Sequence, residues 1–166
     1  MMPPVPLPGS LSVGHDCFAC GLDNPRGLQI PYVLVEGAVE ATFTLGAEHS
    51  GAPAFVHGGI IVTVIDEAMA WATIALRSRF AVTTELTTRF RRPVLIDRPH
   101  LVRATCGELQ ANGRTLRVTA TVTRADGKVC TEAEGTYYAM TVEETAVASG
   151  VPALPDEMLR AFGTSG

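Results

Sequence analysis

The residues most able to do chemistry lie together in one apolar stretch of the sequence. His57-Gly58-Gly59 precedes a run of apolar residues that is interrupted by two adjacent carboxylates, Asp66 and Glu67. An ionised carboxylate inside an apolar helix is unfavourable unless it is paired, protonated or facing a cleft. The histidine and the glycines place backbone N–H groups and the positive end of a helix dipole where an oxyanion could bind. The stretch therefore predicts a catalytic site.

Helix geometry separates these groups into two half-sites. His57 and Asp66 are nine positions apart, which corresponds to about 13 Å along an α-helix and about 180° around it. The two side chains of one chain therefore cannot reach the same reacting atom. We expect a homodimer in which each of two sites takes the helix start from one subunit and Asp66 from the other. Adjacent helix positions point about 100° apart, so Glu67 need not face the same cleft.

One long helix and several strands must position these residues. The apolar run predicts a helix from about 58 to 77 that ends in a basic residue. Alternating apolar and polar residues predict strands, and Asn112-Gly113 and Asp126-Gly127 predict tight turns. The expected strands cover 32–45, 81–94, 101–111, 115–124 and 129–142, and a short helix is expected at 155–162.

A single apolar helix can be buried by these strands only if the sheet wraps around it. This is the α+β arrangement known as the hotdog fold, a curved antiparallel sheet around one long central helix. We divide the chain into an N-terminal arm with a CxxCG segment (1–31), a hotdog domain (32–145) and a C-terminal tail with a short helix (146–166). The open edge of such a sheet favours dimerisation.

Composition excludes several other classes of protein. The chain has 166 residues, of which 46% are hydrophobic, and a mean hydropathy of +0.21. These values fit one globular domain with a substantial core. The net charge of -4 gives no general reason to expect nucleic acid or an anionic membrane as a partner. Asp66 and Glu67 interrupt the one apolar run that approaches the length of a membrane span.

The four cysteines and the first residues predict a cytoplasmic protein. The proline-rich start lacks a basic n-region and a long apolar core, so we expect an arm rather than a signal peptide. The thiols of Cys17, Cys20, Cys106 and Cys130 are then expected to be reduced. Cys17-x-x-Cys20 favours a packing role over a metal or redox role, because zinc needs two more ligands and His15 with a distant cysteine is a weak set. No metal or cofactor is expected.

Segments in and around the predicted helix carry a family resemblance. Residues 54–61 continuing to 66–72, together with 83–86 and 89–94, resemble the hotdog acyl-CoA thioesterases. The PaaI-type branch is the most similar group, within the set that includes 4-hydroxybenzoyl-CoA thioesterase-like proteins. The resemblance covers about residues 33–142, and its most specific part is the helix motif. The segment 17–28 is similar to one found ahead of the fold in some relatives.

The resemblance implies a catalytic role for four residues. Asp66 matches the carboxylate that acts as general base or nucleophile on the thioester carbonyl. Gly58 matches the residue whose N–H holds the thioester oxygen, and His57 matches one that orients or polarises that end of the substrate. Thr83 matches a hydroxyl that places the attacking water. Thr84 is the alternative, because a one-residue shift reverses the face of a strand.

Other residues are expected to bind the acyl-CoA substrate. Gly59 lies beside the predicted oxyanion site and Glu67 beside Asp66. Arg91 belongs to a basic run with Arg89 and Arg92. This run forms either a rim for the CoA phosphates or simply a solvated face.

One position departs from the family pattern. Gly51 stands six residues before the histidine, where many relatives have Asn or Gln. The missing amide weakens the oxyanion side of the site and leaves His57 or His49 to compensate. Asn24 in the arm is a candidate for supplying that amide.

Thioester hydrolysis is the leading prediction among three functions. The second is a hotdog dehydratase or hydratase acting on 3-hydroxyacyl chains, because residues 67–70 resemble part of the carrier-protein dehydratase motif. The spacing from His49 to Glu67 is wider than in that family. The third is a non-catalytic acyl-CoA-binding protein, which Gly51 favours. The acyl group, the choice between CoA and carrier-protein thioesters, and dimer or dimer of dimers all stay open.

Overall fold

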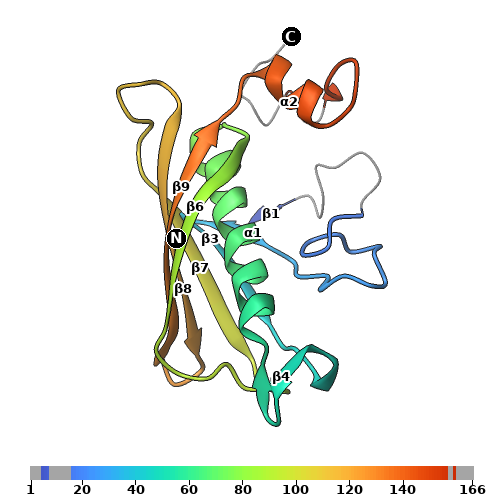
Figure 1. The fold of residues 1–166 in the computed structure, drawn as a ribbon, viewed down its shortest axis with the longest axis vertical. Coiled ribbons are helices and arrows are strands. Elements are labelled where there is room, and N and C mark those ends of the chain that lie inside the picture. Colours follow the sequence, from blue (N-terminus) through green and yellow to red (C-terminus); the bar gives the residue numbers. More distant parts are fainter. Residues whose placement is uncertain (1–4, 8–15, 157–158, 160–166) are drawn as a thin grey trace.

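A seven-stranded antiparallel sheet forms the frame of the molecule (Figure 1). The computed structural model describes residues 5–7, 16–156 and 159. Within these residues the strands lie in the order β1-β2-β3-β7-β8-β9-β6. They span β1 Val5–Pro6, β2 Val33–Val35, β3 Ala38–Phe43, β6 Ala81–Phe90, β7 His100–Cys106, β8 Thr115–Arg124 and β9 Val129–Ala139. A 3-10 turn at Ala47–His49 leads into a separate hairpin of β4 (Ser50–Ala52) and β5 (Phe55–Val56).

The long helix α1, Gly58–Arg77, lies along one face of this sheet. It begins at His57, whose Nδ1 caps the first turn by accepting a hydrogen bond from the N–H of Gly59 at 2.9 Å. It ends at Ser78, which adopts the left-handed conformation with φ +51°. The predicted hotdog fold is therefore confirmed: one curved antiparallel sheet packs around one long helix.

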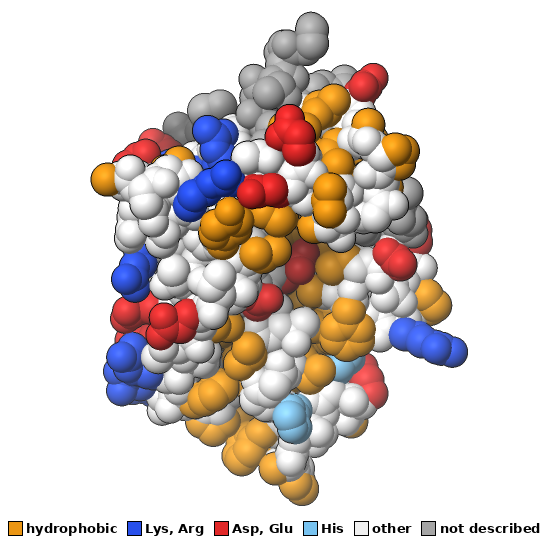
Figure 2. Space-filling model, turned by 45° about the horizontal axis from the view of Figure 1, so that its top comes forward, with side chains coloured by type: hydrophobic (Ala, Val, Ile, Leu, Met, Phe, Trp, Pro, Cys, Tyr) orange, Lys and Arg blue, Asp and Glu red, His pale blue; other side chains and the backbone are white. Residues whose placement is uncertain are grey.

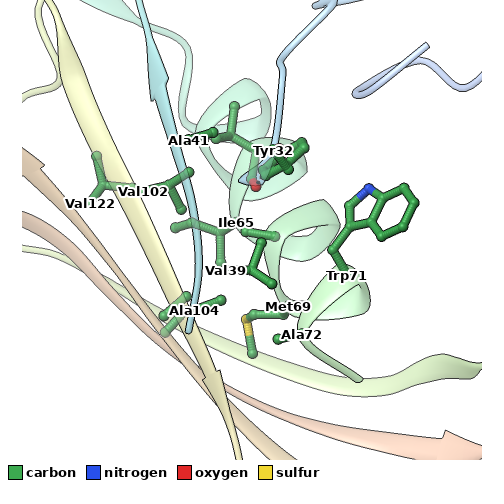
Figure 3. Close-up of a cluster of buried hydrophobic side chains, with 14 of the residues drawn as sticks. Tyr32, Val39, Ala41, Ile65, Met69, Trp71, Ala72, Val102, Ala104 and Val122 are labelled. Carbon is green, nitrogen blue, oxygen red and sulfur yellow. Dashed lines mark hydrogen bonds between the residues drawn. The ribbon is translucent and has the colours of Figure 1, made fainter. Parts of the chain in front are cut away.

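The core fills the space between α1 and the sheet (Figure 3). Ile65 and Met69 of the helix are completely buried. They pack among small and β-branched side chains of the strands, which include Val39, Ala41, Val102, Ala104 and Val122. By length and hydropathy alone α1 resembles a membrane-spanning helix. Its burial as the core helix of the domain accounts for that composition.

Strands β3, β7, β8 and β9 largely alternate between buried and more exposed residues, while β6 is mostly exposed, and one of the two predicted turns forms as expected. Glu36-Gly37 divides the first stretch into the β2–β3 hairpin, with Gly37 at φ +69°. Asp126-Gly127 joins β8 to β9, and the N–H of Gly127 donates to the Arg124 carbonyl at 2.9 Å. Asn112-Gly113 lies instead within a longer connection over 107–114, where Asn112 Oδ1 accepts from the N–H groups of Arg114 and Thr115.

The two ends of the domain differ from the expected elements. The last strand ends at Ala139, and a helix, α2, spans Val142–Ala148 across the predicted boundary at 145. Its capping box is formed by Thr141 and Glu144, the residue pattern that starts many helices. The strand predicted at 81–94 ends at Phe90, before Arg92-Pro93. Most of the helix expected at 155–162 lies outside the described residues.

Residues 16–31 cover the side of α1 that faces away from the sheet (Figure 1). Cys20 and Ile30 of this segment are buried in the same hydrophobic cluster as the helix. Just after it, the Tyr32 hydroxyl donates to the Val64 carbonyl at 3.0 Å. Trp71 points away from the sheet, as Figure 3 shows, yet it is only 4% exposed. The predicted arm is thus a packed part of the domain over these residues.

Candidate active site

Asp66 faces the sheet, where one of its oxygens accepts two hydrogen bonds. Thr83 Oγ1 donates from β6 at 2.7 Å, and the Tyr137 hydroxyl donates from β9 at 2.9 Å. Tyr137 is fully buried, and this burial, together with the nearby Asp66 carboxylate, raises the pKa of its hydroxyl. The hydroxyl therefore stays protonated and remains a donor at neutral pH. Two donors on one oxygen fix the direction of the carboxylate.

A β-bulge decides which threonine reaches this carboxylate. Thr83 pairs with Tyr137, while the next pair along β6 is Glu85 with Thr136, so Thr84 is the extra residue. The Thr84 hydroxyl donates to the Thr136 carbonyl at 2.9 Å. Of the two predicted candidates, the structure brings Thr83 to Asp66 and turns Thr84 to the backbone of β9.

The start of α1 offers two donors for a developing negative charge. Because His57 Nδ1 accepts from Gly59, the neutral ring carries its proton on Nε2 and can donate there. The N–H of Gly58 is at the first position of the helix, where no intrahelical acceptor is available. The N–H of Gly59 is already used by the cap. Phe90 of β6 packs at this end, since a Cβ on Gly58 would lie 3.5 Å from its ring.

Gly51 is in close contact with the helix start, which explains the departure from the family pattern. A Cβ at this position would lie 2.8 Å from the Cα of His57, closer than carbon atoms pack. The 3-10 turn just before β4 is held to the same residue, because the His57 N–H donates to the His49 carbonyl at 2.8 Å. A side chain at position 51 therefore cannot be added without moving the β4–β5 hairpin or His57.

Two predicted substrate-binding residues make contacts elsewhere. The amide of Asn24 donates to the Asp16 carbonyl at 3.1 Å, and its oxygen accepts from the Arg26 N–H at 3.0 Å. These bonds hold Asn24 within the N-terminal segment, and the structure does not bring it to His57. Arg91 pairs with Glu132 on β9 at 2.8 Å, with both side chains substantially exposed.

Glu67 points away from Asp66, toward the N-terminal segment. Its carboxylate accepts from the Cys17 thiol at 3.6 Å, and burial raises the pKa of Glu67 to about 7. Hydrogen bonds from Cys20 lower the pKa of the Cys17 thiol to about 5, and the same contact raises the pKa of Cys20. The two adjacent carboxylates of α1 thus lie in different surroundings.

Tyr137 is a site residue that sequence reasoning missed. The alternation along 129–142 predicts that it points inward, but an inward tyrosine in a strand is most often part of the core. Its contact with Asp66 depends on the register between β6, β9 and the helix. The sequence contains no local signal for that register.

Comparison with known proteins finds similarity to thioesterases. Residues 54–131 match the model of the thioesterase superfamily. Over 124 residues the chain is 29% identical to acyl-coenzyme A thioesterase THEM4 of Mus musculus. The aligned region covers 72% of this chain and 52% of that protein. The match therefore spans about half the length of this relative.

Solved structures show the same fold. The crystal structure of a thioesterase superfamily protein has a TM-score of 0.69 and 26% identity, over 75% of this chain and 60% of the other. A Streptococcus mutans protein bound to acetyl CoA has a TM-score of 0.61 and 22% identity, over 67% of this chain and 88% of the other. The fold and the helix motif thus define a hotdog protein. Residues 54–131 of its sequence are similar to the thioesterase superfamily, which agrees with the predicted resemblance.

Proposed function

We propose that this protein hydrolyses an acyl-CoA thioester to a free acid and CoA. The observation that carries the proposal is the Asp66 carboxylate, held by Thr83 and Tyr137, in a domain similar to an acyl-CoA thioesterase. The carboxylate either takes a proton from the attacking water or attacks the carbonyl itself to form an anhydride that water then hydrolyses. In both routes the C–S bond breaks and CoA leaves as the thiol. The similar structure with bound acetyl CoA supports this ligand class.

We propose further that each active site is shared by two subunits of a homodimer. β6 is an edge strand of the sheet, paired only with β9 among the described residues, and it exposes Val82 and Phe90. Figure 2 shows hydrophobic side chains gathered over much of one face of the molecule. The unpaired N–H and C=O groups of such an edge strand can form hydrogen bonds with a strand of another chain. A dimer of dimers would extend the same assembly.

The contacts of β6 explain how pairing would complete the site. One end of the strand meets Asp66 through Thr83, and the other end places Phe90 beside Gly58. Antiparallel pairing of β6 with its two-fold copy reverses one strand relative to the other. The Gly58 end of one subunit then lies next to the Asp66 end of the other.

The remaining groups take supporting roles in this proposal. The His57 Nε2–H and the Gly58 N–H bind the thioester oxygen, and losing one such donor typically lowers kcat by about 10²–10³. Arg89 and Arg91 are exposed and pair with Glu134 and Glu132, and in this proposal they exchange these partners for the CoA phosphates. A reducing compartment, the cytoplasm, is the proposed location, because all four cysteines are free thiols.

A panel of acyl-CoA esters from acetyl to palmitoyl, with one aromatic ester, tests the proposal through release of free thiol. Asp66→Asn is expected to lower kcat by at least about 100-fold, since a positioned general base contributes 10²–10⁴. Asp126→Asn is the matched control: this aspartate pairs with Arg124 in the β8–β9 turn, and its variant keeps wild-type activity. Light scattering should give twice the 17.6 kDa chain mass or a higher multiple.

Three results would refute the proposal. Addition of water to an enoyl-CoA without thiol release would favour the hydratase, and binding of every ester without turnover would favour a non-catalytic acyl-CoA-binding protein. A fully active monomer would overturn the shared site.

A further inference from the structure

Two thiols and one carboxylate meet between the N-terminal segment and α1, on the far side of the helix from Asp66. Cys17 and Cys20 flank a short turn, and Glu67 reaches them from the helix. The two Sγ atoms and a carboxylate oxygen all lie within 4.8 Å of one another. In Figure 1 this segment runs beside α1 on the side opposite the sheet. None of these contacts takes part in the proposed hydrolysis.

The spacing of these atoms matches a tetrahedral zinc site. Zn–S bonds of about 2.3 Å and Zn–O bonds of about 2.0–2.2 Å place a sulfur and an oxygen ligand about 3.5 Å apart. Cys17 Sγ and Glu67 Oε1 are 3.6 Å apart. Two cysteines separated by two residues are also the usual spacing of zinc-binding thiols. The N–H of Cys20 points at the sulfur of Cys17 at 3.5 Å, which holds that ligand in place.

The surroundings of Glu67 also favour a cation over simple packing. Glu67 is partly buried, and burying a carboxylate is costly unless a strong partner compensates it; a thiol is only a weak donor. The other two buried cysteines lack this arrangement. The Cys106 thiol lies 3.4 Å from the Gly107 carbonyl, and the Cys130 thiol lies 3.6 Å from the Pro93 carbonyl. In this protein, the thiols of cysteines that only pack in the core thus donate to backbone carbonyls.

We propose that Cys17, Cys20 and Glu67 bind one zinc ion per chain. Thiolate ligands select zinc over magnesium or calcium, which prefer oxygen donors. The described residues supply three ligands, and water or an added ligand fills the fourth position. The ion takes the place of the two thiol protons. It ties the turn at Cys17 to the middle of α1, independently of whether the protein hydrolyses thioesters.

Zinc content measures this directly. Untagged, fully reduced protein is dialysed with Zn²⁺ and then against metal-free buffer, and the metal is quantified by plasma emission. We expect one zinc per chain in the wild type. The variants Cys17→Ser and Cys20→Ser should lose it, and Glu67→Gln should bind at least ten times more weakly. Cys106→Ser is the matched control and should keep one zinc per chain, because its thiol contacts only backbone.

A second measurement needs no variant and so does not depend on whether the variants fold. Wild-type protein loaded with Co²⁺ in place of Zn²⁺ should show intense thiolate-to-metal charge-transfer absorption with tetrahedral visible bands. Reduced wild type that retains no zinc would overturn the proposal. Unchanged zinc content in a folded Cys17→Ser protein, or cobalt bands without charge transfer, would overturn it equally.

Discussion

Replacing Tyr137 by Phe isolates the hydrogen bond that orients Asp66. The change removes one hydroxyl and keeps the buried ring, so the core between β9 and α1 stays filled. A hydrogen bond to a charged group contributes about 1.5–3 kcal/mol. Without it, Asp66 loses one of the two donors that fix the direction of its carboxylate.

The size of the effect follows from the same range. A change of about 1.4 kcal/mol in an activation free energy changes a rate about tenfold. The hydrogen bond contributes to the rate by holding the carboxylate in the direction of the reacting carbonyl. We therefore expect kcat/KM to fall by about 10- to 100-fold.

The assay is thiol release from the best acyl-CoA ester, with kcat/KM measured at one neutral pH. Thr83→Val removes the second donor and should also lower kcat/KM, and the double variant should lower it further. Tyr138→Phe is the matched control, because that hydroxyl contacts Glu144 on the other side of the sheet. A Tyr137→Phe enzyme that keeps the wild-type kcat/KM would refute this reasoning.

Two further predictions concern Gly51, which lies beside the start of α1, and His100, which is buried at the start of β7. Gly51→Ala should lower kcat and the melting temperature together, because the new methyl would lie 2.8 Å from the Cα of His57; unchanged values for both would contradict the packing argument. The two ring nitrogens of His100 contact the Arg98 carbonyl at 2.9 Å and the Leu95 N–H at 3.4 Å. Burial lowers the pKa of this histidine, so the folded state binds a proton there less readily than the unfolded chain does. This residue therefore makes the free energy of unfolding fall as pH drops below about 6.5, and His100→Gln should make that fall smaller in urea titrations at two pH values. An equal fall in both proteins would show that His100 does not contribute.

The helix and most strands could be predicted because their signals are local. The apolar run, the histidine before it and the basic residue at its end place α1 at 58–77, as observed. Alternation and two tight turns place most of the strands. The capping box of Thr141 and Glu144 is also a local signal, but the polar residues around it do not show the apolar periodicity that predicts a helix, so α2 is missed.

The details of the site depended on features that no single segment encodes. With regular pairing beyond Glu85, Thr84 would lie opposite Tyr137, and only the bulge gives that place to Thr83. The contact between Tyr137 and Asp66 joins residues 71 positions apart. The meeting of Glu67 with Cys17 likewise requires the chain before the sheet to fold back over the helix. Such long-range contacts arise from packing rather than from periodicity.

The different directions of Asp66 and Glu67 give the two carboxylates of α1 different neighbours. Asp66 contacts side chains of β6 and β9, and Glu67 contacts the Cys17 thiol of the N-terminal segment. A substitution of Cys17 therefore changes the hydrogen bonding of Glu67 without removing a donor of Asp66. The two carboxylates stay linked through their charges, because burial and, less strongly, the nearby Asp66 raise the pKa of Glu67.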